Sequence, residues 1–418
     1  MSFSTFGLPD ALLQAVKRLG WTTPTPVQSA GLGAALQGRD LLGCAPTGSG
    51  KTLAFALPVL AHLNHSRSKQ PTALVLVPTR ELASQVGDVL LSLAQELPER
   101  IKVSVVFGGV SINPQMMAMR GGTQVLVATP GRLLDLVAHN AVKLSEVSLL
   151  VLDEADRLLD LGFANELTQL LALLPARRQH LFFSATFPPA VQTLAQQMLN
   201  NPVRVDVRPD SAPPVDIVQR VIAVDTPKRT QLLRHLITQH GWSRVLVFVA
   251  TKFAAEIVAD KLRKAGFTAE PFHGELSQGK RTQVLTDFKA ERLRVVVATD
   301  VAARGLDITQ LPVVVNFDLP RSANDYIHRV GRTGRAGEPG LAVSLVSAAT
   351  LAHWRLIAKR QRLDLAMESI EGFVALETAP PASSHPDAPG NGGIKGKRPS
   401  KKDKLRALVA QRPDTSQT

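Results

Sequence analysis

Short apolar runs alternate with segments of helical periodicity along the first half of the chain. These runs show no regular alternation with polar residues, and each ends at polar or small ones. Runs of this kind, separated by helix-length segments, are typical of strands buried on both faces of a parallel sheet. The pattern predicts strands over residues 41–44, 73–77, 103–107, 125–128, 149–152 and 180–183.

A second series of the same kind follows a break in the pattern. Residues 209–217 contain three prolines and little apolar content, which is typical of a linker. The chain therefore reads as an α/β protein of two domains, residues 1–208 and 218–371, each with a mostly parallel sheet flanked by helices. In the second domain we expect strands over 245–249, 295–298, 313–317 and 341–346, and a helix over 252–266 with Ala254, Ile257, Val258, Leu262 and Ala265 on one face.

The N-terminal segment combines a helical pattern with a proline-rich stretch. Apolar residues recur at helical spacing from Leu8 to Leu19 and stop at a glycine. The prolines at positions 24 and 26 predict an extended, stiff conformation for residues 21–28. Trp21 is either a core residue or a stacking surface for a flat base whose edge Gln28 reads.

Residues 45–52, Ala-Pro-Thr-Gly-Ser-Gly-Lys-Thr, lie between a predicted strand and an apolar helical pattern at 53–63. A strand, a glycine-rich turn and a helix form the setting that a phosphate cradle requires, because backbone N–H groups and the helix N-terminus attract anions. Lys51 is expected to reach the outer phosphates, and the Thr52 hydroxyl to hold Mg²⁺. Ala45 stands where the general pattern has glycine, and alanine is small enough to fit.

Two further strand ends carry candidate chemistry. Asp153-Glu154-Ala155-Asp156 follows one predicted strand, and Ser184-Ala185-Thr186 follows another. One carboxylate at such a strand end can hold a Mg²⁺ that bridges phosphates, and a second can orient or deprotonate a water. Acidic residues here can also be simple helix N-terminal charges, and the hydroxyls can belong to a turn. The phosphate loop upstream favours the catalytic interpretation of the acidic segment.

The second domain has arginines in place of a phosphate loop. Arg304 lies in the segment 298–307, and Arg329, Arg332 and Arg335 recur three residues apart. Arginines at this spacing lie on one side of a helix or tight turn. They can neutralise a phosphate that is being transferred, a role worth roughly 10³–10⁵ in rate. An exposed basic face is the alternative.

Composition narrows the class of protein. The net charge of +13 and a pI of about 10.2 favour a polyanionic partner such as nucleic acid, although a basic surplus also serves solubility. Residues 378–393 are low in complexity and expected to be disordered, and the basic tail at 395–412 is expected to bind RNA non-specifically. The single cysteine excludes internal disulfides, no apolar run approaches the ~18 residues of a membrane helix, and the N-terminus lacks a secretory signal pattern. A cytoplasmic protein is expected.

The motifs together resemble those of the DEAD-box ATP-dependent RNA helicases, a branch of helicase superfamily 2. The acidic segment spells D-E-A-D at 153–156, and the phosphate loop, the Ser-Ala-Thr motif and the arginine motif at 328–335 occur in the family's order. The resemblance covers residues 3 to about 365. It implies two tandem RecA-like domains followed by a disordered basic tail at 372–418, and the layout is most similar to the bacterial RhlE-like group, which acts in ribosome assembly and RNA turnover.

The resemblance implies roles for the residues around ATP. Gln28 would read the adenine edge and Trp21 would stack on its face, where the family usually has Phe or Tyr. Asp153 would hold Mg²⁺ through water and Glu154 would act as general base, while His328 would join the network that links the Ser-Ala-Thr motif to ATP. The other residues implied are Phe3, Thr47, Gly48, Ser49, Gly50, Lys51, Thr52 and Asp307 for ATP, Arg332 and Arg335 as arginine fingers, and Ser184 and Thr186 for coupling.

RNA contacts are implied at strand ends in both domains, where backbone amides could meet phosphates. The low aromatic content of 5% favours backbone and sugar contacts without sequence reading. The residues implied are Pro78, Thr79, Arg80, Gly109, Thr129, Pro130, Gly131 and Arg132 in the first domain, and Gln278, Arg281, Thr299 and Asp300 in the second.

The resulting prediction is an RNA-stimulated ATPase that requires ATP and Mg²⁺ and locally separates short RNA duplexes without sequence preference. Ribosomal-subunit precursors or the RNA-degradation machinery are the expected partners, with no membrane involved. Two alternatives stay open: an RNA clamp that does not unwind, and a DNA helicase or translocase of the same superfamily. A guanine-nucleotide switch is disfavoured, because the sequence has no Asn-Lys-x-Asp motif.

Overall fold

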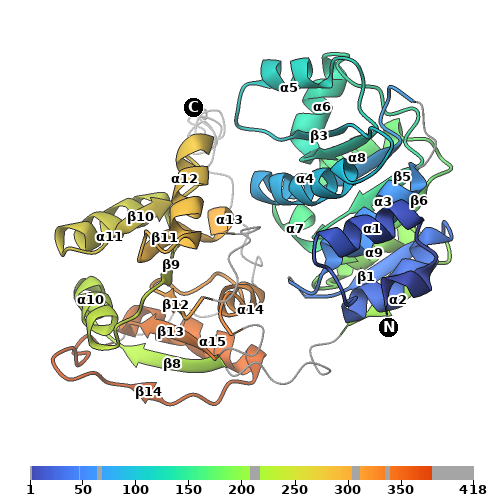
Figure 1. Cartoon of the computed structure of the whole chain (residues 1–418). Helices are drawn as coiled ribbons and strands as arrows, with labels where there is room; N and C mark the ends of the chain where they lie inside the picture. The colour runs from blue at the N-terminus through green and yellow to red at the C-terminus, as the bar shows by residue number, and fades with distance from the viewer. Residues whose placement is uncertain are drawn as a thin grey trace, which may run out of the picture. The chain divides into compact units, whose positions relative to one another are not determined.

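The computed structural model describes residues 2–46, 48–63, 68–207, 217–303, 311–334 and 339–378. Within these ranges the chain forms two seven-stranded sheets, and every strand pairing in them is parallel (Figure 1). The expectation of two helix-flanked parallel sheets is confirmed. The predicted linker at 209–217 lies outside the described residues except for Ile217, which already begins the second sheet.

The first sheet has the strand order β3-β4-β2-β5-β6-β1-β7. Its strands are β1 (Leu41–Cys44), β2 (Ala73–Leu76), β3 (Val103–Val106), β4 (Val125–Ala128), β5 (Leu149–Leu152), β6 (Gln179–Ser184) and β7 (Val203–Asp206). Its helices are η1 (Phe3–Phe6), α1 (Asp10–Arg18), α2 (Pro26–Leu36), α3 (Lys51–His62), α4 (Arg80–Gln95), α5 (Ile112–Met119), α6 (Pro130–Ala138), α7 (Ala155–Asp160), α8 (Ala164–Leu173) and α9 (Pro189–Met198).

A hydrophobic core lies on each face of the first sheet. Alternate strand residues such as Val75 and Val151 pack with helices α1 to α4. The residues next to them, such as Leu74 and Leu150, pack with helices α6 to α9. Because both faces are covered, polar groups can reach solvent only at the strand ends. This arrangement explains why the central strands are uninterrupted apolar runs.

The second sheet has the order β10-β11-β9-β12-β13-β8-β14. Its strands are β8 (Ile217–Ala223), β9 (Val245–Val249), β10 (Ala269–Phe272), β11 (Val295–Thr299), β12 (Val313–Asn316), β13 (Gly340–Val346) and β14 (Met367–Glu368). Its helices are η3 (Thr226–Lys228), α10 (Arg229–Gln239), α11 (Lys252–Lys264), α12 (Gln278–Lys289), α13 (Asp300–Ala303), α14 (Ala323–Val330), η4 (Ala348–Thr350) and α15 (Leu351–Gln361).

The chain stays packed on the second sheet beyond its last helix. The Phe373 ring lies 5.3 Å from the His235 ring, and Asp225 accepts hydrogen bonds from the backbone N–H groups of Leu376 and Glu377, each at 2.9 Å. The first compact unit accordingly extends through Glu377. The first residues of the expected tail, 372–377, are thus part of this unit, and residues 379–418 lie outside the described part of the chain.

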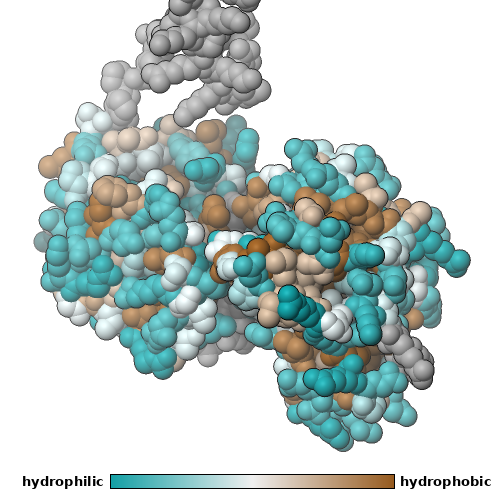
Figure 2. Space-filling view, turned by 90° about the horizontal axis from the view of Figure 1, so that it is seen from above, coloured by the Kyte–Doolittle hydropathy of each residue, from teal (hydrophilic) through white to brown (hydrophobic). Residues whose placement is uncertain are grey.

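Hydrophilic residues cover most of the face shown in Figure 2, with hydrophobic ones interspersed. Large exposed apolar side chains in the described ranges include Phe253 and Ile257 on α11. Among the described helices, none is long and apolar enough to cross a membrane.

Candidate active site

Strand order brings together motifs that are far apart in the sequence. β5, β6 and β1 are neighbours, so the phosphate loop, the acidic segment and the Ser-Ala-Thr motif share one half of the carboxyl edge of the first sheet. β3, β4 and β2 form the other half and lead to Gly109, Thr129 and Pro78. The residues expected to bind ATP and those expected to bind RNA therefore occupy two adjoining halves of one edge, where parallel sheets place their ligands.

The phosphate loop joins β1 to α3 through two left-handed glycines. Gly48 and Gly50 have φ values of 83° and 91°, which glycine adopts readily and other residues rarely do. A Cβ at Gly50 would also lie 2.6 Å from Nε2 of Gln28, too close for any side chain. Lys51 is buried, and its Nζ donates to the carbonyl of Ala45 at 2.9 Å. The loop therefore holds a buried cation at the N-terminus of a helix, a setting that suits a polyphosphate.

Gln28 connects the N-terminal segment to this loop. Its Oε1 accepts a hydrogen bond from the N–H of Thr25 at 2.9 Å, and its Nε2 donates to the carbonyl of Gly50 at 2.9 Å. The amide keeps one N–H and one lone pair for an adenine edge. Phe3 belongs to the core on this face of the sheet, and Trp21 packs against that core while partly exposed.

Asp153, Glu154 and Asp156 put three buried carboxylates within four residues. Burial raises the pKa of Asp153 to about 6, the positive charge of Lys51 opposes this rise, and the negative charge of Glu154 adds to it. A buried carboxylate without a full counter-charge fits a divalent cation. The described residues contain no cluster of three or more protein ligands for a metal. Asp153 and Thr52 would thus supply only part of the coordination of Mg²⁺, and substrate oxygens and water the rest, as is usual for this ion.

The raised pKa of Asp153 predicts a pH-dependent requirement for Mg²⁺. Only the carboxylate binds the cation, so the half-saturating Mg²⁺ concentration for ATP hydrolysis should stay constant above the pKa of about 6 and rise about tenfold per pH unit below it. Mg²⁺ titrations of the hydrolysis rate from mildly acidic to neutral pH measure this, with the affinity of Mg²⁺ for free ATP at each pH as the reference. A half-saturating concentration that follows free ATP alone would contradict the prediction.

The Ser-Ala-Thr motif holds Asp156, the last residue of the acidic segment. Oγ of Ser184 accepts a hydrogen bond from the N–H of Asp156 at 3.2 Å. One carboxylate oxygen of Asp156 accepts from both the N–H and the Oγ1 of Thr186, at 3.0 and 2.7 Å. Ser184 and Thr186 thus bind the start of helix α7 directly, and their coupling role stays a prediction.

Glu154 lies at the start of the same helix in a strained backbone conformation. Its φ and ψ are both 51°, in the left-handed region that non-glycine residues seldom occupy and that is often found at functional sites. Oε2 of Glu154 accepts a hydrogen bond from Nη1 of Arg157 at 2.7 Å, and both side chains are about 95% buried. Sequence reasoning did not identify Arg157, although an acid and a base three residues apart on a helix are a recognisable signal.

The RNA half of the edge contains the start of α4. Thr79 caps this helix by accepting a hydrogen bond from the N–H of Leu82 at 3.2 Å, and Arg80 reaches the carbonyl of Gly109 at 3.5 Å. Gly109 has a φ of 77°, and the Arg80 guanidinium fills the space where a Cβ would be. Pro78, Thr79, Arg80, Gly109 and Thr129 all line one hollow in the surface.

The start of α6 presents a second cationic group at this end of the sheet. Pro130 and Gly131 form its first turn, and Arg132 is buried there. Nη2 of Arg132 donates to the carbonyl of Val110 at 2.7 Å, and its Nε lies 3.6 Å from Oδ2 of Asp135. Nη1 has no hydrogen-bond partner among the described residues. A buried guanidinium with one nitrogen free to donate at a helix N-terminus fits a phosphate oxygen.

In the second domain, Arg281 is buried and closely held. Its Nη1 donates to the carbonyl of His273 at 3.0 Å, its guanidinium lies over the Phe272 ring, and its Nη2 lies 2.7 Å from Oε1 of Glu81. Gln278 begins α12, and its buried Oε1 lacks a hydrogen-bond partner among the described residues. Of these two residues, Gln278 has the free acceptor that a ribose hydroxyl could meet.

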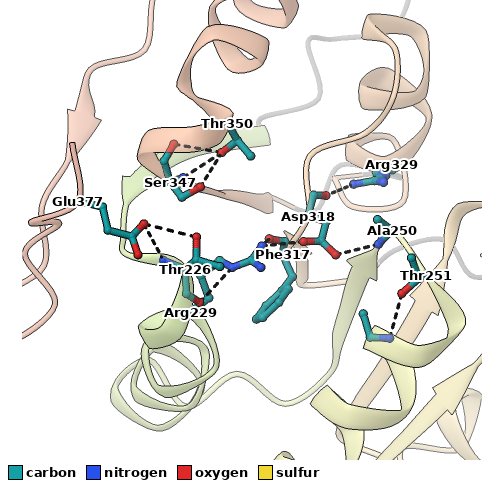
Figure 3. A network of polar contacts seen from close by, with 11 residues as sticks. Thr226, Arg229, Ala250, Thr251, Phe317, Asp318, Arg329, Ser347, Thr350 and Glu377 are labelled. Atoms are coloured by element: carbon teal, nitrogen blue, oxygen red, sulfur yellow. Dashed lines mark hydrogen bonds and ion pairs between the residues drawn. The ribbon is translucent and has the colours of Figure 1, made fainter. Parts of the chain in front are cut away.

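Thr299 ends β11, and Asp300 after it is engaged by an arginine. Nε and Nη2 of Arg329 donate to the two carboxylate oxygens of Asp300 at 2.6 and 2.7 Å. Nη1 of Arg329 donates to the carbonyl of Asp318, and the Asp318 side chain binds Arg229 and the N–H of Ala250 (Figure 3). The interpretation of Arg329 as one of a row of phosphate-facing arginines is therefore wrong: it is 2% exposed and joins α14 to α13.

His328 and Arg332 lie at the end of α14 and in the turn that follows it. Burial, and next the positive charge of Arg157, lower the pKa of His328 to about 4, so the ring is neutral at pH 7. Arg332 is buried. Three candidate residues, Thr47, Asp307 and Arg335, lie outside the described part of the chain, as does Arg304.

The fold and the site define a P-loop nucleotide hydrolase with two parallel-sheet domains. Residues 25–194 match the DEAD/DEAH box helicase family, and residues 228–337 match the helicase conserved C-terminal domain. The chain belongs to the DEAD-box ATP-dependent RNA helicases and is therefore an enzyme that hydrolyses ATP.

Individual relatives come from plants, bacteria and yeast. The chain is 40% identical over 354 residues to DEAD-box ATP-dependent RNA helicase 20 of Arabidopsis thaliana. The aligned region covers 83% of this chain and 70% of that protein. It is 37% identical over 370 residues to RhpA of Helicobacter pylori, covering 88% and 74% of the two chains. The structure of S. cerevisiae Dbp5 bound to RNA and ADP BeF3 matches with a TM-score of 0.77 and 29% identity, over 88% of this chain and 95% of that one.

Proposed function

We propose that this chain is an RNA-stimulated ATPase that separates or remodels short RNA duplexes as it binds and hydrolyses ATP with Mg²⁺. The observation that supports this most strongly is the shared edge of the first sheet. Lys51, Asp153 and Glu154 gather after β1 and β5, next to the hollow lined by Thr79, Arg80 and their neighbours after β2, β3 and β4. Nucleotide and RNA would therefore be neighbours on one domain.

The chain's own groups have separable roles in hydrolysis. The buried Lys51 would bind the outer phosphates, and the remaining N–H and lone pair of the Gln28 amide would take the adenine edge. Glu154 would accept a proton from the attacking water, and Arg332 and Arg335 would stabilise the charge that develops on the transferred phosphate. Mg²⁺, held by Thr52 and Asp153, would neutralise phosphate charge.

RNA would be bound through its backbone. Phosphate oxygens are favoured by the helix starts at Arg80 and Pro130, by the free Nη1 of Arg132 and by the basic balance of the chain. Few aromatic side chains are present to stack bases. RNA held by both domains would close them around ATP, and hydrolysis would reopen them. By linkage, RNA should raise ATP affinity by the same factor as ATP raises RNA affinity. A cytoplasmic role in ribosome assembly or RNA turnover belongs to this proposal.

Strand separation tests this function against a clamp that only binds. A short RNA duplex with a single-stranded extension should come apart in the presence of enzyme and ATP, whereas the same duplex in DNA should not. A duplex of scrambled sequence is the matched control and should separate equally well, because the expected contacts are to backbone and sugar. RNA binding and ATP hydrolysis without strand separation would favour the clamp.

A further inference from the structure

Arg157 is set where it can orient the expected general base. Ser184 and Thr186 bind Asp156 at the start of α7. The other carboxylate oxygen of Asp156 accepts a hydrogen bond from the N–H of Arg157 at 3.1 Å. The guanidinium then reaches back to Oε2 of Glu154 at 2.7 Å. The strand-end hydroxyls are thus connected to the Glu154 carboxylate through one turn of helix.

The carboxylates of this segment have different partners. Asp156 is satisfied by Thr186 and by the N–H of Arg157, and the charge of Lys51 acts on Asp153. Arg157 is the cation that pairs with Glu154, with side chains 4% and 5% exposed. A buried ion pair of this kind is costly to break from one side, because the remaining charge is left without a partner. The Glu154 carboxylate is therefore held at one oxygen in a fixed position.

The second oxygen of Glu154 is the one that matters for chemistry. Oε1 has no hydrogen bond to any residue in the described ranges, whereas Oε2 is taken by Arg157. The left-handed backbone at Glu154 fixes where its side chain begins, and Arg157 fixes where it ends. A base held in this way at one oxygen, with the other free, is preorganised to accept a proton from a water.

We propose that Arg157 is a positioning residue for ATP hydrolysis: it clamps Oε2 of Glu154 so that Oε1 faces the attacking water, and it transmits the state of the Ser-Ala-Thr motif to that base through Asp156. The proposal rests on the assignment of Glu154 as general base. It adds a function for the residue directly after the D-E-A-D segment.

Four variants test the proposal by steady-state ATP hydrolysis at saturating RNA: Arg157→Met, Arg157→Lys, Glu154→Gln and the double variant Glu154→Gln with Arg157→Met. Loss of a supporting contact of this kind typically costs about 10- to 100-fold, so Arg157→Met should lower kcat by that factor with little change in KM for ATP. Arg157→Lys keeps the charge and should recover most of the rate. The double variant should be no slower than Glu154→Gln, because the clamp then has no base to place.

The controls separate positioning from folding. Arg220→Met removes an arginine from a partly buried ion pair on the second sheet and should leave kcat unchanged. Thermal unfolding of each variant checks stability, and the double variant, which has no unpaired carboxylate at position 154, should fold even if Arg157→Met does not. The inference is overturned if Arg157→Met leaves kcat unchanged or raises it, or if the losses of the two single variants multiply. If Glu154→Gln itself keeps full activity, the assignment of the general base fails instead.

Discussion

Replacing Lys51 with alanine should reduce ATP hydrolysis by about 10²- to 10³-fold, because the loss of one preorganised donor at a developing charge costs about that much. The effect has two physical sources. Lys51 is buried at the start of α3, where it would contact the outer phosphates, and its positive charge also counters the rise in the pKa of Asp153. In the variant the affinity for ATP should fall, and the pKa of Asp153 should rise further.

The measurement is the steady-state release of phosphate by purified wild type and variant in the presence of RNA. Lys143→Ala is the matched control, since Lys143 is an exposed lysine of the same domain away from the site, and it should retain the wild-type rate. RNA binding without nucleotide should survive in Lys51→Ala, because the RNA half of the sheet edge is separate from the loop. Substantial turnover by the variant would show that the loop at 45–52 is not the phosphate site.

The central strands could be predicted within a residue or two from the sequence because both of their faces are buried. The runs at 41–44, 125–128, 149–152 and 245–249 match β1, β4, β5 and β9. Four other strands, β7, β8, β10 and β14, were not predicted. β7, β10 and β14 lie at sheet edges, and β8 lies beside the edge strand β14. Edge strands such as β7 have exposed polar residues, so no continuous apolar run marks them in the sequence.

In the segment at 21–28, helix-start signals outweigh the extended conformation that the prolines predict. The prolines predicted an extended conformation throughout, yet α2 begins at Pro26. Proline is favoured at the first position of a helix, and the Gln28 side chain accepts a hydrogen bond from the N–H of Thr25, which is one half of a capping box. The helical start places the Gln28 amide against the phosphate loop, where an extended chain would not.

Helix α11 was predicted with its apolar face shifted. The residues buried on it are Ala255, Val258, Ala259 and Leu262, whereas Ile257 is 36% exposed. The prediction is correct for Val258 and Leu262, and Ala254 packs partly buried against the same core, whereas Ile257 lies off that face. Small and β-branched residues on both sides of the helix make the periodicity ambiguous, and only packing on the sheet decides between them.

The candidate site shows what spacing alone cannot reveal. The phosphate loop and the acidic segment could be predicted because each is a local motif at a strand end. The role of Arg329 could not, because its partner Asp300 is 29 residues away and the ion pair forms only when α13 and α14 pack together. The RhlE-like subgroup also remains a prediction, since the relatives described above come from plants as well as bacteria.

RNA dependence of ATP hydrolysis is the second large effect that we expect. If RNA drives closure of the two domains, it brings Arg332 and Arg335 to the transferred phosphate, a contribution worth roughly 10³–10⁵ where a second domain supplies such an arginine. Part of that gain should appear as stimulation by RNA of at least about tenfold. DNA lacks the 2′-hydroxyl groups that distinguish the two nucleic acids and should stimulate far less.

The most direct measurement is therefore the rate of ATP hydrolysis with no nucleic acid, with single-stranded RNA, and with single-stranded DNA of the same length and sequence. Strong stimulation by RNA with little by DNA is the result predicted by coupling between the ATP and RNA halves of the site. Equal stimulation by DNA would keep the ATPase assignment and contradict the RNA specificity. A rate that neither nucleic acid changes would contradict the coupling itself.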